Sequence, residues 1–424
     1  LHDGGAREMT KVVRAALSGL ISGLVKRAGI RADDVLEITI VGNPIMHHLL
    51  LGIDPVPLGS APFALATDGA VRIRASELRL PANPGARIYV LPCIAGHVGA
   101  DTAGVILAEE PQADADAIHL IVDVGTNAEI VLGNRDRLLA ASSPTGPAFE
   151  GAQISSGQRA APGAIERVRI DPATLEPRFR VIGSPVWSDE PGFAEATAST
   201  GVTGICGSGI VEVVAQLFLA GVVTADGVID GALANRSPRI VPDGRTFSYL
   251  LHDGSPRILV TQNDVRAIQL AKAALYAGVR LLMDHLGIDA VDDVRLAGAF
   301  GSEIDVLHAM VLGLIPDCDL DRVASAGNAA GTGALIALLS QSARTEIEGV
   351  VRRVEKIETA VEPRFQEHFV EAMAFPHRTA SYPNLMRAVE LPARPANHDR
   401  AGSGDQARRR RRRAAGRPRA GVES

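Results

Sequence analysis

The chain has 424 residues and 46% of them are hydrophobic, which is enough to bury the cores of two or three subdomains. Its apolar residues never run uninterrupted for the roughly 18 positions that a membrane-spanning helix needs, so a membrane span is not expected. The formal net charge of −6 at pH 7 argues against nucleic acid as the principal ligand.

Hydrophobic periodicity and turn residues predict helices alternating with strands along the whole chain. The predicted helices cover residues 9–28, 45–51, a glycine-lined segment ending near 109, 207–219, 264–286, 304–312 and 327–339. The predicted strands cover residues 35–41, 88–91, 118–123, 129–132, 137–141 and 294–297, with short β segments inside 168–182. Alternation of this kind is typical of an α/β fold.

Two stretches of sequence occur in the same order in both halves of the chain. The strand, turn and helix over 38–55 parallel those over 294–316, and the glycine-rich helix start at 96–104 parallels the one at 327–334. The second half opens with a hairpin at 123–127, so the first half should open with an equivalent Asp-x-Gly-Thr hairpin upstream of its first helix. The chain begins at Leu1 without an initiator Met, and we therefore expect an N-terminally truncated fragment. Chance similarity between glycine-rich α/β turns is the alternative.

The strongest chemical motif is Asp123-Val124-Gly125-Thr126-Asn127, which follows an apolar strand and precedes Glu129. Glycine lets the backbone approach a phosphate closely, and the Thr and Asn side chains add donors at an anion-binding turn. The aspartate cannot bind phosphate itself, so it is the candidate Mg²⁺ ligand or the group that orients a nucleophilic water. An ordinary Asp-Gly hairpin is the alternative.

Three further positions are candidates for the same site, each with a structural alternative. Gly207, Ser208 and Gly209 open a helix, where anions bind, although Ser208 also fits a simple helix cap. Gly298-Ala299-Phe300-Gly301 is suited to hold a nucleoside, or is a plain strand-to-helix turn. Asp101 is placed to activate water or hold a metal, or only to face a helix dipole.

Three other features have weaker links to the chemistry of the site. Lys272 on the longest predicted helix is either a phosphate contact or a solvated lysine. The three cysteines, Cys93, Cys206 and Cys318, are more than a hundred residues apart, a spacing that suggests neither a disulfide framework nor a metal cluster and favours a reducing cytoplasm. The segment from residue 391 carries ten arginines against three acidic residues, including the run Arg408 to Arg413. It is either a nucleic-acid or membrane arm or a solvated tail, and we predict a disordered basic tail over 377–424.

Taken together, these motifs resemble the reductive activators of corrinoid proteins, whose C-terminal domain belongs to the ASKHA superfamily of actin, sugar kinases and heat-shock chaperones. The resemblance covers roughly residues 10–375. The passages that carry it are 41–52, 98–101, 122–129, 155–165, 204–209, 270–274, 297–301 and 327–330.

The resemblance implies a duplicated α/β fold of the actin and ribonuclease H type with two subdomains. Residues 1–117 would be the remainder of the first subdomain, and 118–376 the second, with the nucleotide site. It implies ATP and Mg²⁺ as ligands, with ATP held by Asp123, Gly125, Thr126, Asn127, Gly207, Ser208, Gly209, Gly298, Ala299, Phe300 and Gly301. Asp123, Asp101 and Glu129 are the candidate catalytic residues, and Asp123 the candidate Mg²⁺ ligand.

By the same resemblance, the protein would help to reduce Co(II) corrinoid to Co(I) at the expense of ATP. The partners would be a corrinoid protein and an electron donor that acts through a ferredoxin-type [2Fe–2S] domain, which this chain lacks along with the first phosphate hairpin. A homodimer is compatible with this picture. The alternatives are a small-molecule kinase of the same superfamily, for which Asp101 would serve as the catalytic base, and a non-catalytic docking module for a corrinoid protein.

Overall fold

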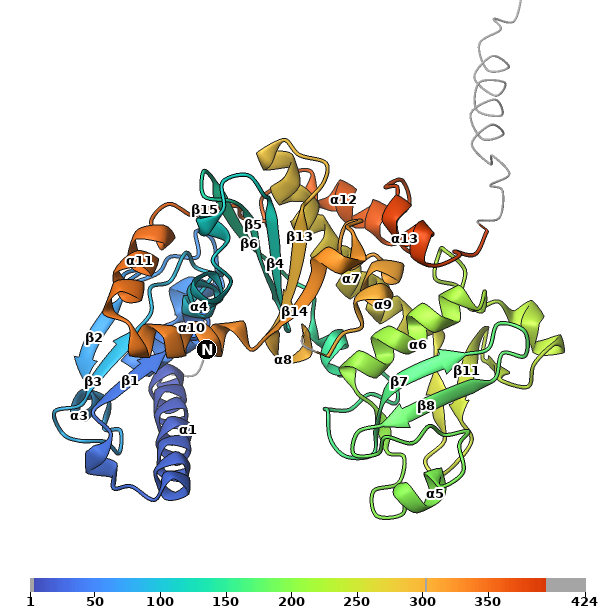
Figure 1. The fold of residues 1–424 in the computed structure, drawn as a ribbon, viewed down its shortest axis with the longest axis horizontal. Coiled ribbons are helices and arrows are strands. Elements are labelled where there is room, and N and C mark those ends of the chain that lie inside the picture. Colours follow the sequence, from blue (N-terminus) through green and yellow to red (C-terminus); the bar gives the residue numbers. More distant parts are fainter. Residues whose placement is uncertain (1–3, 302, 394–424) are drawn as a thin grey trace, which may run out of the picture.

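The computed structural model describes residues 4–301 and 303–393, and Figure 1 shows their arrangement. A six-stranded sheet occupies the middle, an N-terminal three-stranded sheet lies on one side of it, and two further three-stranded sheets lie on the other. The predicted mixed α/β architecture is confirmed, and most of the predicted elements occur within a few residues of their predicted bounds.

The central sheet has the strand order β14-β13-β4-β5-β6-β15. Its strands are β4 (His119–Val124), β5 (Ala128–Gly133), β6 (Leu138–Ser143), β13 (Asp293–Ala297), β14 (Val323–Gly327) and β15 (Glu355–Lys356). Strands β4, β5 and β6 form an antiparallel meander, and β13 runs parallel to β4 on the other side. The meander strands are apolar and buried because helices cover both faces of the sheet.

The N-terminal unit is built on a small sheet of order β1-β3-β2, in which β1 and β3 are parallel. Its elements are α1 (Gly5–Ala28), η1 (Ala32–Asp34), β1 (Glu37–Ile40), α2 (Pro44–Leu51), η2 (Val56–Gly59), β2 (Val71–Arg74), α3 (Ala75–Leu78), β3 (Arg87–Val90), α4 (Ala100–Glu109) and η3 (Pro111–Ala113). One face of the sheet presents isoleucines and valines to a cluster that includes residues of α1, and the other face presents arginines.

The predicted internal repeat is present in the structure. Strands β1 and β3 pair in parallel and lead into α4, just as β13 and β14 pair in parallel and lead into α10 (Ala329–Leu339). The two helices cross where Gly104 meets Gly333, and a Cβ at Gly333 would lie 1.9 Å from the Gly104 carbonyl oxygen. Only glycine permits this approach, so the crossing joins the two halves of the repeat through backbone contact.

The remaining elements lie on the far side of the central sheet. In chain order they are η4 (Pro147–Glu150), β7 (Ala164–Ile170), β8 (Pro177–Val181), α5 (Phe193–Ala196), β9 (Gly204–Ile205), α6 (Gly207–Leu219), η5 (Gly231–Asn235), β10 (Ile240–Asp243), β11 (Thr246–His252), β12 (Ile258–Val260), α7 (Gln262–Leu286), α8 (Gly298–Gly301), α9 (Val306–Leu312) and η6 (Leu320–Arg322). Helix α7 begins with a capping box between Thr261 and Asp264 and ends at Gly287, which adopts a left-handed conformation.

The C-terminal segment continues beyond the predicted start of the tail at residue 377. The last helices are α11 (Gln341–Val351), α12 (Phe365–Ala372) and α13 (Pro383–Ala388). Residues 377–393 therefore differ from the prediction, because Tyr382 and Leu385 are buried in the core and Asp317 accepts hydrogen bonds from Asn384. The predicted disorder of residues 394–424 lies outside the described residues.

Two side-chain predictions also have structural outcomes. Lys272 is fully buried and its ammonium donates to the carbonyl oxygens of Ala374 (2.6 Å) and Pro376 (2.7 Å), so both the phosphate-contact and the solvated-lysine interpretations are wrong. The three cysteines are free and buried. Among the described helices, none combines the length and apolar character needed to cross a membrane.

Candidate functional site

Three carboxylates gather where the repeat halves meet. Asp123 is the last residue but one of β4, Glu129 lies directly opposite it on β5, and Asp101 lies in the first turn of α4. Burial and the Asp101 charge raise the pKa of Asp123 to about 6, and burial together with both aspartates raises the pKa of Glu129 to about 8. Burial also raises the pKa of Asp101. These shifts mean that the three groups are close enough to repel one another.

No cationic side chain compensates this cluster within the described part of the chain. The pKa values of all three carboxyls are raised primarily by burial, with hydrogen bonds as the opposing effect: Thr102 for Asp101 and Ser142 for Glu129. Carboxylate oxygens are the ligands that Mg²⁺ prefers, and a divalent cation would remove the repulsion. The carboxylate chemistry suits Mg²⁺, but within the described residues the ligand atoms of Asp101, Asp123 and Glu129 do not all lie within 4.8 Å of one another, so the three would hold the ion partly through water.

The chain passes directly over the Asp123 carboxylate as it leaves β13. In the parallel register, Ala297 is the partner of Asp123, so Gly298 comes next to the end of β4. Gly298 has φ 92°, and a Cβ there would lie 2.4 Å from Asp123 Oδ1. A side chain at this position would clash with the carboxylate and with the Val124 backbone, so the close approach of this turn to Asp123 requires glycine.

The segment after Gly298 is a single helical turn, α8, where the sequence predicted a turn between strand and helix. Gly301 is buried behind Leu296 at the end of β13. The side chains of Ala299 and Phe300 lie outside what the structure describes. Their predicted role beside a nucleoside stays a prediction.

The Gly125-Thr126-Asn127 turn is fixed by the loop that follows the meander. Thr145 Oγ1 donates to the carbonyl oxygens of Gly125 and Thr126, each at 3.0 Å. The Thr126 hydroxyl donates to Glu150 Oε1 at 2.6 Å, so its proton is already used. Asn127 is exposed and lines a cavity of about 380 Å³. Among the turn's side chains, the Asn127 amide is therefore the donor most accessible to a phosphate.

The glycines at the start of α6 have a packing role in the structure. Gly207, Ser208 and Gly209 are buried, and a Cβ at Gly209 would lie 2.2 Å from the carbonyl oxygen of Ile165 on β7. Helix α6 also contacts η4, which carries the Glu150 that bonds to Thr126. The α6 start is thus linked to the Asp123 hairpin through η4, and its contact with a nucleotide stays a prediction.

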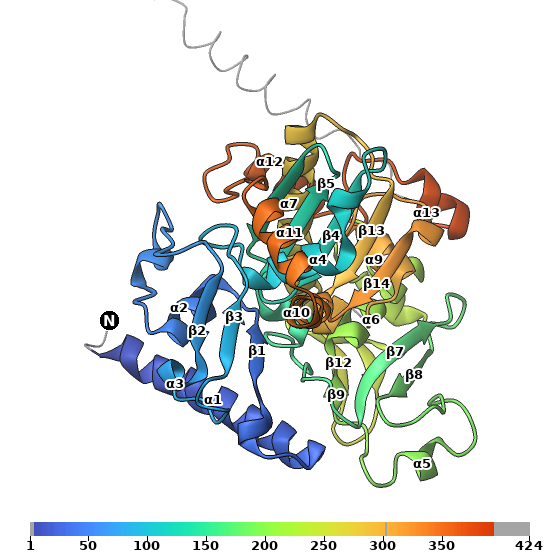
Figure 2. The same ribbon diagram turned by 60° about the vertical axis from the view of Figure 1, so that its left-hand side comes forward.

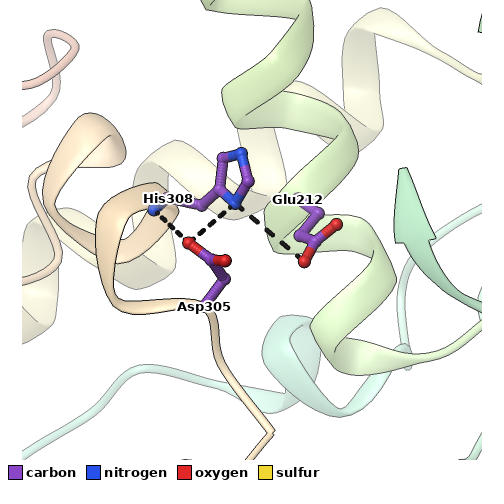
Figure 3. A group of neighbouring side chains, drawn as sticks. All are labelled: Glu212, Asp305 and His308. Atoms are coloured by element: carbon purple, nitrogen blue, oxygen red, sulfur yellow. Dashed lines mark hydrogen bonds and ion pairs between the residues drawn. The ribbon is translucent and has the colours of Figure 1, made fainter. Parts of the chain in front are cut away.

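A second group of potential metal ligands lies between α6 and α9. Figure 3 shows Glu212, Asp305 and His308 pointing toward one another, with their ligand atoms within 4.8 Å. Glu212 is fully buried, but Arg167 and Arg169 donate to its two oxygens at 3.0 Å and 2.8 Å. A divalent cation would add positive charge to carboxylates already balanced by guanidinium groups, so this cluster is an ion-pair network that ties α6 to β7 and α9.

Sequence reasoning missed two polar partners of the site. Ser142 on β6 donates to Glu129 Oε1 at 3.3 Å, and Glu150 accepts from Thr126. The pairing of β5 with β6 would have identified Ser142, because the register places it directly opposite Glu129. No local pattern identifies Glu150, since its contact depends on how the 145–150 loop returns to the hairpin.

Family models match nearly the whole described chain. The model described as "C-terminal domain of RACo the ASKHA domain" matches residues 117–386, and the RACo middle region matches residues 2–113. The chain is also similar to a solved structure titled "Reductive activator for corrinoid,iron-sulfur protein", with a TM-score of 0.77 and 33% identity, covering 89% of this chain and 58% of that one.

Two curated relatives are also similar. The chain is 35% identical over 381 residues to the corrinoid activation enzyme RamQ of Eubacterium limosum, which covers 86% of this chain and 61% of the relative. It is 29% identical over 243 residues to the [Co(II) methylated amine-specific corrinoid protein] reductase of Methanosarcina barkeri, covering 54% and 40% respectively. The chain thus spans less than two thirds of the length of either relative.

Proposed function

This chain belongs to the RACo family and contains its C-terminal ASKHA domain, and from this premise we propose that it is the nucleotide-binding part of a reductive activator of a corrinoid protein. Its activity would couple ATP to the reduction of Co(II) corrinoid to Co(I). The curated relatives are a corrinoid activation enzyme and a Co(II) corrinoid protein reductase, and these names support the proposal.

The observation that carries the proposal is the uncompensated carboxylate cluster beside Gly298. ATP arrives with a divalent cation, and Asp101, Asp123 and Glu129 together offer it a negatively charged, partly buried seat. Bound Mg²⁺ would supply charge neutralisation at the phosphates. In our proposal the nucleotide contacts are Gly125, Thr126, Asn127, Gly207, Ser208, Gly209, Gly298, Ala299, Phe300 and Gly301.

In this proposal the three carboxyl groups have different roles because their protonation states differ. Glu129, with its pKa near 8, carries a proton at neutral pH until a cation binds. Asp123, with its pKa near 6, is mostly ionised and is the principal cation holder. Asp101 comes from the other half of the repeat, at the start of α4, and orients or deprotonates the attacking water. Hydrolysis then depends on how α4 and α10 hold the two halves together.

Coupling to the corrinoid requires a change between two arrangements of the protein. We propose closure of the residue 1–117 part on the residue 118–376 part, pivoting at the Gly104–Gly333 crossing, as that change. The electron would come through a ferredoxin-type [2Fe–2S] domain outside this chain. The corrinoid protein is the proposed partner, a homodimer is compatible with the proposal, and the cytoplasm is the proposed compartment.

Calorimetric titration with Mg-ATP tests the proposal directly. We expect the chain to bind Mg-ATP and Asp123→Ala to bind it at least tenfold more weakly, because a charge-assisted contact is worth about 1.5–3 kcal/mol. Asp253→Ala, which removes an exposed aspartate in the β11–β12 turn, is the matched control and should bind as the parent chain does. Equal affinity of the Asp123→Ala variant would contradict the placement of the phosphates.

Phosphate release and partner binding separate the alternatives. The proposed activator releases phosphate from ATP without a small-molecule acceptor, whereas a kinase transfers it to a sugar or acid. A docking module would bind a corrinoid protein with the same affinity with and without nucleotide.

A further inference from the structure

A cavity of about 950 Å³ lies between the N-terminal sheet and the helices α10 and α11. Figure 1 shows α10 and α11 beside β1, β2 and β3, although they are more than 200 residues away in the chain. The cavity is lined on the helix side by Leu339 and Arg344. Its other side includes Arg72, Arg74, Arg87 and Tyr89 together with the acidic residues Glu37 and Glu77. It lies at the C-terminal end of α10, about 9 Å along that helix from Gly333, where α10 crosses α4.

The sheet wall of this cavity holds an unfavourable pair of like charges. In the antiparallel register of β2 and β3, Arg74 stands directly opposite Arg87, and Arg72 stands opposite Tyr89. All four side chains therefore share one face of the sheet. Side chains in directly opposite positions have Cβ atoms about 5 Å apart, and like charges there destabilise the sheet. Such a pair lowers stability unless an anion sits between or above the two guanidinium groups.

Three carboxylates lie near these arginines, and each already has a partner. Glu77, which lines the cavity, accepts from the backbone N–H of Arg74 at 2.9 Å. Glu348 accepts from Arg72 at 2.5 Å and from the Tyr89 hydroxyl at 2.9 Å, and Glu37 pairs with Arg344 at 2.6 Å. Within the described residues, Arg74 and Arg87 are left without a carboxylate in salt-bridge contact. Both are exposed, as is Arg72, which differs in being paired with Glu348.

The Tyr89 ring lies beside two of the cavity's arginines. The central guanidinium carbons of Arg72 and Arg344 are 5.0 Å and 4.7 Å from its centroid. Arg344 also donates to the carbonyl oxygens of Ala337 and Leu338, which fixes it to the end of α10. A ligand held at Arg74 and Arg87 would thus touch the N-terminal sheet on one side and the α10–α11 corner on the other.

We propose that this cavity is a second anion-binding site, separate from the carboxylate cluster, for a small ligand with two adjacent anionic groups such as a diphosphate. Two opposed guanidinium forks at this spacing match two neighbouring phosphoryl groups, each held by paired N–H donors. The ligand bridges the first half of the repeat and the helix corner of the second, and it stabilises the arrangement in which the two are in contact.

The test uses sodium pyrophosphate without Mg²⁺ as the probe, in calorimetric titrations of the whole chain at low ionic strength. We expect the parent chain to bind it and Arg74→Gln/Arg87→Gln to bind it at least tenfold more weakly, as each lost charged contact costs roughly tenfold. Arg245→Gln/Arg353→Gln removes two exposed arginines elsewhere and should bind as the parent does. The Asp123→Ala variant should also keep the pyrophosphate binding, because that carboxylate belongs to the other site.

Thermal melts distinguish anion binding from a purely structural role of Arg74 and Arg87. Removing the like-charge pair should raise the melting temperature of Arg74→Gln/Arg87→Gln without ligand, while pyrophosphate should raise the melting temperature of the parent and not of the variant. The proposal is overturned if the parent does not bind pyrophosphate, or if the arginine variant binds it equally well. It is also overturned if binding is lost only in Asp123→Ala, since the anion would then occupy the proposed nucleotide site.

Discussion

Helices α1 and α7 occupy equivalent places in the two halves of the repeat, yet they are buried to very different extents. Each precedes the first strand of its β–α unit, β1 for α1 and β13 for α7. Helix α7 has sixteen buried residues and α1 has none. Helix α7 packs on β5 and β6 of the meander, whereas α1 packs on α2 and on one face of a three-stranded sheet.

The difference follows from what each helix has to cover. Val13, Leu17 and Ile21 of α1 pack on the small core, while an adjacent stripe of Met9, Val12, Leu20 and Leu24 is 49–65% exposed. In the described part of the chain, β1 is an edge strand, and nothing like the β4–β5–β6 meander stands beside it. Figure 2 shows α1 at the margin of the molecule. Apolar patterning predicts that a helix forms, but the extent of its burial depends on the sheet available to it.

The largest expected contrast comes from truncating one leucine in each helix. Leu275 of α7 is fully buried, so Leu275→Ala should lower the free energy of unfolding by about 3–4 kcal/mol. Leu24 of α1 is 64% exposed, and Leu24→Ala should change it by less than about 0.5 kcal/mol. Urea unfolding followed by circular dichroism measures both values. Equal losses in the two variants would mean that the outer stripe of α1 is covered in solution.

Many elements of the fold could be predicted from the sequence, and others could not. The strands around Asp123 and 294–297, the helices over 207–219 and 264–286, and the repeat itself follow from periodicity and glycine placement, and the structure confirms them. Strands β2 and β10 to β12 were not predicted, because short amphipathic segments such as Val71–Arg74 give too few apolar positions to distinguish them from loops. The fate of Lys272 also depended on distant contacts with Ala374 and Pro376.

The candidate site was predictable in its chemistry and less so in its geometry. The Asp-x-Gly-Thr turn and Asp101 were identified from residue type and glycine context, and the register then places Glu129 opposite Asp123. The close approach of Gly298 to the Asp123 carboxylate depends on the parallel pairing of β4 with β13, across some 170 residues of chain. No local pattern encodes a pairing at that separation.

The meander that α7 covers also carries two of the three carboxylates, so a second contrast concerns pH. The pKa of Glu129 is raised from 4.5 to about 8. Between pH 4.5 and pH 8, Glu129 therefore keeps its proton in the folded chain and has lost it in the unfolded chain. Stability should therefore fall as the pH rises from about 4.5 to about 8, with the full loss present above pH 8.

Glu129→Gln removes this penalty without changing the size of the side chain. At pH 8.5 the variant should be more stable than the parent by about 2 kcal/mol, less than the full pKa shift implies because Asp101 and Asp123 share the repulsion. At pH 4 the two proteins should unfold at nearly the same temperature. Added Mg²⁺ should stabilise the parent more than the variant at pH 8.5, and thermal melts at several pH values check each point. A variant that melts like the parent at every pH would contradict the raised pKa.

The smallest expected change in stability comes from replacing one interior glycine in each of α1 and α7 with alanine. This pair of variants compares the two helices most directly. A Cβ at Gly278 of α7 would lie 2.7 Å from Ile130 Cδ1 on β5 and 3.2 Å from Ser143 Cβ on β6, whereas a Cβ at Gly23 of α1 would meet nothing within 4 Å. Alanine favours a helix interior over glycine by about 0.8–1 kcal/mol, and that gain should appear in full for Gly23→Ala. For Gly278→Ala the contact with the meander should outweigh it, for a net loss of about 1 kcal/mol. Opposite signs in urea unfolding would show that α7 packs tightly on its sheet while the outer face of α1 is open, and a loss in both variants would place a partner surface against α1.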